Sequence, residues 1–248
     1  MNDLIGSALG PSLVPLLLGG LAVFAGAVVQ GAVGFGVALV AAPVVTLLDP
    51  SVMPGAVQVV GAALPLLALA AEWRHVDWRG VGWALLGRVP GVLAGVWVVK
   101  AASPRALAVI VGVMVLAAVA LTAWTVTVPR TPRTLVLAGA VSGVTGTATS
   151  IGGPPMALVY QHARGPRIRA TLAVYFVAGS AVSMGALAAG GELPARAVVA
   201  GLLLVPFMIA GFAAAGPLRR YLDGGRIRVA VLVVAALSAV LLLIRGAG

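Results

Sequence analysis

The residues with the most suggestive chemistry are two matching sets of glycines and prolines, each within an apolar stretch. The first set is Gly31, Gly34 and Gly36 with Pro43, and the second is Gly143, Gly146, Gly152, Gly153, Pro154 and Pro155. A shift of the sequence by 112 positions places Gly31 on Gly143 and Pro43 on Pro155. Glycine and proline release backbone N–H and C=O groups, which in a membrane must be satisfied by protein or line a wet cavity. Paired interruptions in two halves therefore predict the binding site of a transporter.

The second interruption also carries hydroxyl groups, which suit an anion. Its residues Thr145, Thr147, Thr149 and Ser150 lie in an eight-residue run that ends at Gly152. A helix that restarts after such an interruption presents free N–H groups and a partial positive charge at its N-terminus. We therefore expect substrate contacts from this interruption and from the first one, where Phe35 separates two glycines.

Three longer polar side chains lie inside apolar stretches. Arg88 follows five largely apolar residues, and a charge at membrane depth is a functional candidate by default. One interpretation is that Arg88 attracts an anionic substrate. The other is that its guanidinium group extends to the membrane–water interface. Gln30 and Gln58 contact the substrate, or alternatively tie helices together. The sequence leaves both pairs of alternatives open.

Close helix packing is the other explanation for the glycines, since small residues let membrane helices approach each other. Packing alone does not predict two matched interruptions, one with Gly-Gly-Pro-Pro and neighbouring hydroxyls. Gly31 to Gly36 also mimics a dinucleotide fingerprint, but no strand precedes it. No His, Asp or Glu cluster has metal-ligand spacing, and no nucleophile stands near a base. We therefore expect neither an enzyme nor a metal or other cofactor.

The composition predicts that these residues lie in a membrane protein. The chain has 248 residues, of which 61% are hydrophobic and 9% are charged, whereas a soluble domain has roughly a quarter charged residues. The formal net charge is +10, but the basic residues lie singly or in small groups at the ends of apolar segments. That pattern sets membrane topology and does not indicate nucleic-acid binding. The chain has no cysteine, so disulfides are excluded.

Ten apolar segments position the candidate residues, and they predict an all-α, polytopic membrane helix bundle. The segments flanking the interruptions are too short to cross a hydrocarbon core of roughly 30 Å as single helices. Each half therefore holds one broken or re-entrant element plus three spans, about eight transmembrane helices in total. The segments are 11–30, 34–48, 54–72, 80–100, 104–126, 133–147, 151–163, 168–190, 195–216 and 226–245.

Basic loop residues favour re-entrant elements. If each broken element enters and leaves on one side, eleven basic residues lie inside and four outside; if each crosses once, the numbers are nine and six. The positive-inside rule favours the first arrangement, which makes residues 1–128 and 129–248 inverted repeats within a single membrane domain. Both arrangements place the two termini outside.

The glycine motifs resemble the sulfite exporter TauE/SafE family of membrane permeases. The resemblance rests on Ala25 to Gly36, on Ser142 to Gly146 leading to Gly152-Gly153-Pro154-Pro155, and on Arg169-Ala170-Thr171. It implies a multi-pass carrier of the bacterial inner membrane for small sulfur-containing anions such as sulfite or sulfonates. The first half has Ala41-Ala42-Pro43 where the second has Gly153-Pro154-Pro155, so we expect the first interruption to be less open.

These observations lead to one main hypothesis and two alternatives. The main hypothesis is a secondary transporter that holds a small anion between the broken elements and works by alternating access. The alternatives are an anion channel and a membrane subunit of a larger complex. The expected partners are the anion and the lipid bilayer, and a homo-oligomer is compatible with the sequence. Substrate identity, direction of transport and coupling ion are left open.

Overall fold

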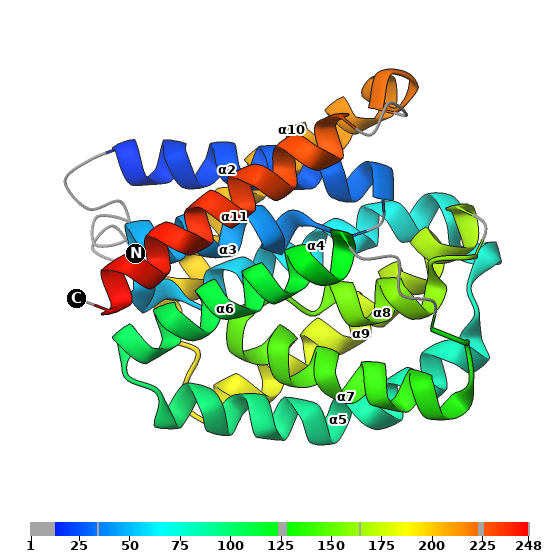
Figure 1. Ribbon diagram of the computed structural model, residues 1–248, viewed down its shortest axis with the longest axis horizontal. Coiled ribbons are helices and arrows are strands. Elements are labelled where there is room, and N and C mark those ends of the chain that lie inside the picture. Colours follow the sequence, from blue (N-terminus) through cyan, green and yellow to red (C-terminus); the bar gives the residue numbers. More distant parts are fainter. Residues whose placement is uncertain (1–12, 34, 124–127, 164, 223–225, 248) are drawn as a thin grey trace.

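The computed structural model describes residues 13–33, 35–123, 128–163, 165–222 and 226–247, and every regular element within them is a helix. The long helices lie side by side as a bundle (Figure 1). The elements are α2 (Leu13–Val33), α3 (Val37–Leu48), η1 (Pro50–Val52), α4 (Gly55–Glu72), η2 (Trp73–His75), α5 (Trp78–Ala101), α6 (Pro104–Ala123), α7 (Pro132–Thr149), α8 (Gly153–Tyr160), α9 (Gly165–Ala189), α10 (Ala195–Leu222) and α11 (Arg226–Ala247).

The ten α-helices of the described residues correspond in order to the ten predicted apolar segments. Five of them are long and apolar enough to cross a membrane: α2, α5, α6, α9 and α10. Shorter apolar stretches lie in α3, α4 and α11. The prediction of an all-α, polytopic membrane bundle is therefore confirmed. The helix α8 is shorter than predicted, with eight residues where the predicted segment runs from 151 to 163, and α10 is longer, with 28 residues where the predicted segment runs from 195 to 216.

Each interruption separates two helices that pack against each other as a hairpin. In Figure 1, α3 turns back from the middle of the bundle beside α2, and α8 turns back beside α7. Gly36 precedes α3 with φ 137°, a value that L side chains rarely adopt. Ser150 follows α7 in the left-handed conformation, with φ 64°. The chain therefore reverses direction within the bundle at both interruptions.

The helices of the two halves are interleaved. The contacting pairs include α5 with α7, α2 with α10, α4 with α9 and α6 with α11. Glycines bring the backbones of α5 and α7 together, because a Cβ atom added at Gly87 or Gly139 would collide with a backbone carbonyl of the other helix. The hydrophobic core therefore lies between the halves as much as within them.

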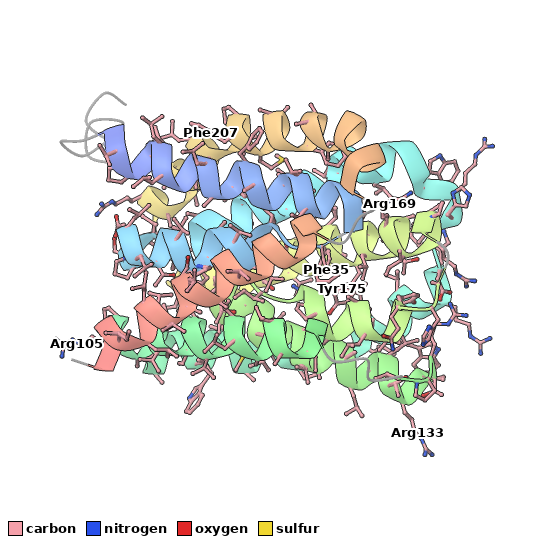
Figure 2. All side chains as sticks on the ribbon, turned by 45° about the horizontal axis from the view of Figure 1, so that its top comes forward. Phe35, Arg105, Arg133, Arg169, Tyr175 and Phe207 are labelled. Atoms are coloured by element: carbon pink, nitrogen blue, oxygen red, sulfur yellow. The ribbon has the colours of Figure 1, made fainter. Side chains whose placement is uncertain are left out.

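The loops gather at two ends of the bundle. Figure 2 shows Arg105 at one end and Arg133 at the other. At the end that also holds Arg105, the C-terminus of α3 lies near the start of α10 (Figure 1), and an ion pair joins Asp49 to Arg196 there, with 2.7 Å between Oδ2 and Nη2. The loops before α5, α7 and α9 lie at the opposite end (Figure 1). The loops of the described residues therefore divide between two ends of the bundle.

Candidate functional site

The two interruptions line one central cavity of about 50 Å³. This volume is several times the roughly 10–15 Å³ that one water molecule needs, so the cavity can hold a small ion. Figure 2 places Phe35, which lines the cavity, near the middle of the bundle, away from the ends marked by Arg105 and Arg133. The predicted residues that line it are Gln30, Phe35, Gly36, Gln58, Arg88, Gly146, Ser150, Gly152, Gly153 and Pro154.

The N-termini of two helices face this cavity. Gly36 and the first residues of α3 line it from one half, and Gly152 and the first residues of α8 line it from the other. Each N-terminus carries a partial positive charge of roughly half a unit, although in α8 Pro154 and Pro155 have no N–H group to donate. Gln30 accepts a hydrogen bond from the Val37 N–H at 3.0 Å, so its oxygen fixes the start of α3. The two interruptions together create an electropositive centre.

Arg88 adds a full positive charge to the same centre. It lies in the middle of α5, and only 2% of its surface is exposed. Its Nη1 donates to Ser142 Oγ at 3.1 Å and its Nη2 to Ser183 Oγ at 3.4 Å. The guanidinium lies 4.9 Å from the ring centre of Tyr175, and Nε has no hydrogen-bond partner in the described structure. The alternative that Arg88 reaches an interface is therefore wrong.

No carboxylate neutralises Arg88 within the described residues. Asp49, Glu72, Asp77 and Glu192 all lie at helix ends or in loops, and Asp49 and Asp77 are paired with other arginines. A buried charge without a counter-ion is costly, and an anion in the cavity would supply that counter-ion. The described residues include no group of three His, Cys, Asp or Glu side chains that could hold a metal ion.

Glycines make room for the guanidinium. A Cβ atom added at Gly179 of α9 would lie 2.7 Å from Arg88 Cδ and closer still to Nε and Cζ. A Cβ atom at Gly146 of α7 would lie 3.3 Å from Nη2. Because van der Waals contact needs about 3.5 Å or more, any larger residue at position 179 would require Arg88 to move.

Buried hydrogen bonds hold the second interruption in place. Gln58 of α4 donates to the Gly146 carbonyl at 2.6 Å, one of the last four carbonyls of α7, which lack partners within that helix. Ser142 donates to the Gly152 carbonyl at 2.6 Å, and Ser150 to the Pro54 carbonyl at 3.1 Å. Gln58 therefore ties helices together while it also lines the cavity.

Several predicted site residues do not line the cavity. Gly31 packs against Ala215 of α10 and Gly143 against the backbone of α5, so helix packing explains these two glycines. Thr147 shares a hydrogen bond with Ser183, and Thr149 donates to the Thr145 carbonyl. Of the four hydroxyl residues in that run, the cavity lining includes Ser150 alone. Pro43 lies inside α3, Pro155 lies in α8 outside the lining, and Gly34 lies outside the described residues.

Sequence reasoning missed the contribution of α9. Ser180 lines the cavity, and Gly179 and Ser183 contact Arg88. Ser180 and Ser183 are three residues apart and so share one helix face, beside a glycine, within an apolar helix. This small polar face in an apolar helix is the sequence feature that could have indicated a contribution of α9 to the site. Ser142 of α7 was quoted in the family motif but was not selected as a site residue.

Comparison with known proteins gives two matches at the sequence level. The family model described as "Sulfite exporter TauE/SafE" matches residues 5–242. A protein of Cupriavidus necator, "Probable sulfite/organosulfonate exporter TauE", is 29% identical over 211 residues, which cover 79% of this chain and 81% of the relative. No solved structure matches. The family match spans both interruptions and Arg88.

Proposed function

Because the chain belongs to the sulfite exporter TauE/SafE family of membrane transporters, we propose that it carries a small sulfur oxyanion or organosulfonate by alternating access. The membrane is the inner membrane of a bacterial cell. The relative from Cupriavidus necator carries a name that refers to sulfite and organosulfonates, and a sulfonate group or sulfite offers the same negatively charged oxygens. The anion is held in the central cavity.

The observation that carries the proposal is the convergence of Arg88 and two helix N-termini on one buried cavity. All three groups attract negative charge. The described lining also contains the Ser180 hydroxyl, a hydrogen-bond donor, and no carboxylate that would repel an anion. Desolvation of an anion in the cavity is therefore offset by one formal charge and two helix ends.

The packing pairs support inverted repeats. If α2 to α6 correspond to α7 to α11, the exchange of the halves turns the α5–α7 pair into the α10–α2 pair, while α4–α9 and α6–α11 map onto themselves. This is the pattern expected from a two-fold axis between repeats. In Figure 1 the hairpins α2–α3 and α7–α8 run in opposite directions along the bundle, as inverted repeats require, and they then enter from opposite sides of the membrane. We assign the end with Arg74, Arg130 and Arg133 to the cytoplasm, because basic loops favour that side, and both termini to the outside.

Alternating access follows from this arrangement. The anion lies between two broken helices that belong to different repeats, so movement of one hairpin relative to the other opens the cavity to one side at a time. A channel would instead need a continuous path. Saturable flux with counterflow distinguishes a carrier from a channel.

The test is anion flux into proteoliposomes that contain the purified protein. Sulfite, thiosulfate, sulfate, methanesulfonate and acetate are compared, with and without a pH gradient. We expect saturable flux of at least one sulfur-containing anion, and its loss in Arg88→Gln with unchanged membrane insertion. Arg105→Gln, in which an exposed arginine is removed near the bundle end, is the matched control. Flux of the Arg88→Gln protein at the wild-type rate would refute the assignment of the site.

A further inference from the structure

A second basic cavity lies at the end of the bundle assigned to the cytoplasm. It has a volume of about 800 Å³ and is lined by the segments before α5 and α7, the end of α8 and the start of α9. Its ionisable residues among the described lining are Arg74, His75, Arg130, His162 and Arg167, and we name these five residues the basic vestibule. Central-cavity binding uses none of them.

The only acidic partner that the described structure gives the basic vestibule is Asp77. Its Oδ2 lies 3.0 Å from Arg130 Nη1 and 3.6 Å from Arg167 Nη2, and accepts a hydrogen bond from the Tyr160 hydroxyl at 3.0 Å. Two guanidinium groups thus share one carboxylate, and Arg74 adds a third positive charge to the described lining, so positive charge is in excess. The arginines of the two ion pairs remain 40% and 44% exposed, and an ion from solution can reach them.

The helix α8 connects the basic vestibule to the central cavity. Gly153 and Pro154 at its start line the central cavity, and Val159 near its end lines the vestibule. Eight residues at 1.5 Å per residue make α8 about 12 Å long. An anion in the basic vestibule is therefore one short helix away from the electropositive centre that contains Arg88.

We propose that the basic vestibule is a second anion site, in which an oxyanion binds from the cytoplasm before it reaches the central cavity. The inference rests on the proposed function. The ligand has the chemistry of a sulfonate, sulfite or phosphate group, whose oxygens accept paired hydrogen bonds from arginine. Lipid phosphate shares this chemistry, but the lining consists of loops and helix ends at the end of the bundle. A dissolved anion is therefore the ligand.

Binding in the basic vestibule has a consequence for Asp77. The carboxylate joins the segment before α5, in the first half, to Arg130, Tyr160 and Arg167, in the second half. An oxyanion competes with Asp77 for the two guanidinium groups and so weakens this connection between the halves. Occupation of the basic vestibule thus favours separation of the halves at the cytoplasmic end.

Two substitutions with opposite expected effects test the site. Asp77→Asn removes the competing charge and keeps a side-chain oxygen for the N-cap of α5, in which Asp77 accepts from the Gly80 N–H at 3.2 Å. Anion binding should tighten about fivefold, the effect of one unit charge at about 4 Å in water. Arg130→Gln should weaken binding by a similar factor. If Asp77 and Arg130 had a purely structural role, both substitutions would change the affinity for the anion in the same direction.

The measurement is fluorescence of Trp73, which is exposed and lies 5.7 Å from the Arg74 guanidinium. The variant used keeps Trp73 and has its other tryptophans replaced, and it carries Arg88→Gln to remove the central site. It is titrated in detergent with sodium sulfite, and a parallel titration uses sodium chloride of equal ionic strength. Asp49→Asn and Arg196→Gln, which alter the ion pair at the opposite end, are matched controls that should leave the titration unchanged.

Each outcome separates the two proposals. A saturable sulfite signal with opposite shifts in Asp77→Asn and Arg130→Gln supports the basic vestibule, whether or not the wild-type protein transports sulfite. Absence of saturation, or saturation only after phosphatidylglycerol is added, overturns the site for a dissolved anion. Wild-type flux that depends on Arg88, together with no Trp73 signal, overturns the vestibule alone. A Trp73 signal without flux of any anion overturns the proposed transport alone.

Discussion

Replacement of Gly179 by alanine tests whether the position of Arg88 determines anion binding. The added Cβ atom would lie 2.7 Å from Arg88 Cδ and nearer to Nε and Cζ. Carbon atoms in contact need about 3.5 Å or more, so the arginine side chain must move by about 1 Å. The hydrogen bonds to Ser142 and Ser183, at 3.1 and 3.4 Å, leave little room for that shift.

The expected effect on transport is large. A misplacement of about 1 Å in a positioning group can cost about 100-fold in rate, which corresponds to about 2.7 kcal/mol at 1.36 kcal/mol per decade. We expect flux at low anion concentration to fall by a factor of that order in Gly179→Ala. Overpacking should also lower stability by about 1–3 kcal/mol, and a thermal melt in detergent measures this effect separately.

The matched control is Gly185→Ala in the same helix. A Cβ atom added at Gly185 meets no atom within 4 Å, and alanine favours helix by about 1 kcal/mol relative to glycine. Gly185→Ala should therefore keep wild-type flux and equal or greater stability. The assay is concentration-dependent anion flux in proteoliposomes with protein amounts matched by immunoblot. Equal flux in Gly179→Ala and Gly185→Ala would refute the argument that Arg88 binds the anion.

Three further substitutions address the cavity and its walls. Gly61→Leu should block anion flux without unfolding the protein, because Gly61 lines the cavity and its added Cβ meets no atom within 4 Å. The control Gly82→Leu, whose added Cβ also meets open space, should transport normally. Equal flux in these two variants would contradict the cavity assignment. Gln58→Met should lower stability by about 1–3 kcal/mol, since the buried Gly146 carbonyl loses its donor; an unchanged melting temperature would contradict this. Gly36→Ala should lower the free energy of unfolding by about 1–2 kcal/mol, because a residue with a Cβ atom rarely adopts the positive φ of Gly36. Denaturant titration in detergent measures this loss.

The sequence predicted the fold well because lipid restricts the solutions. Every membrane-spanning backbone group must be paired within a helix, so apolar segments and short polar separators marked nearly all helix positions. The glycines alone were less specific, because several of them, including Gly31 and Gly143, serve helix packing instead. The hairpins α2–α3 and α7–α8 (Figure 1) follow from segments too short to cross alone.

The side-chain partners at the site were harder to predict, because they depend on which helix faces which. Thr149 was expected at the anion, but its hydroxyl donates to the Thr145 carbonyl in its own helix, a common alternative for threonine. Ser183 was not selected, although it contacts Arg88. The contact requires α9 to pack against α5, and one sequence does not specify that pairing.

Arg88 makes the two otherwise matched halves unequal at their centre. A shift of 116 positions, which places Pro90 on Pro206 and Gly95 on Gly211, places Arg88 on Leu204, which is buried and apolar. Each half supplies one helix N-terminus to the cavity, but only the first supplies a formal charge. In alternating access, the strongest attraction therefore stays with α5 in both states. The anion remains beside Arg88 while the hairpins move around it, and its release requires water to reach the guanidinium and weaken the attraction. Under this mechanism, a second arginine at Ser180, a residue of the second half that lines the cavity, would hold the anion more tightly in both states, so binding would strengthen while maximal flux would fall. Greater maximal flux in Ser180→Arg, measured in the same proteoliposomes, would contradict a single charged binding point.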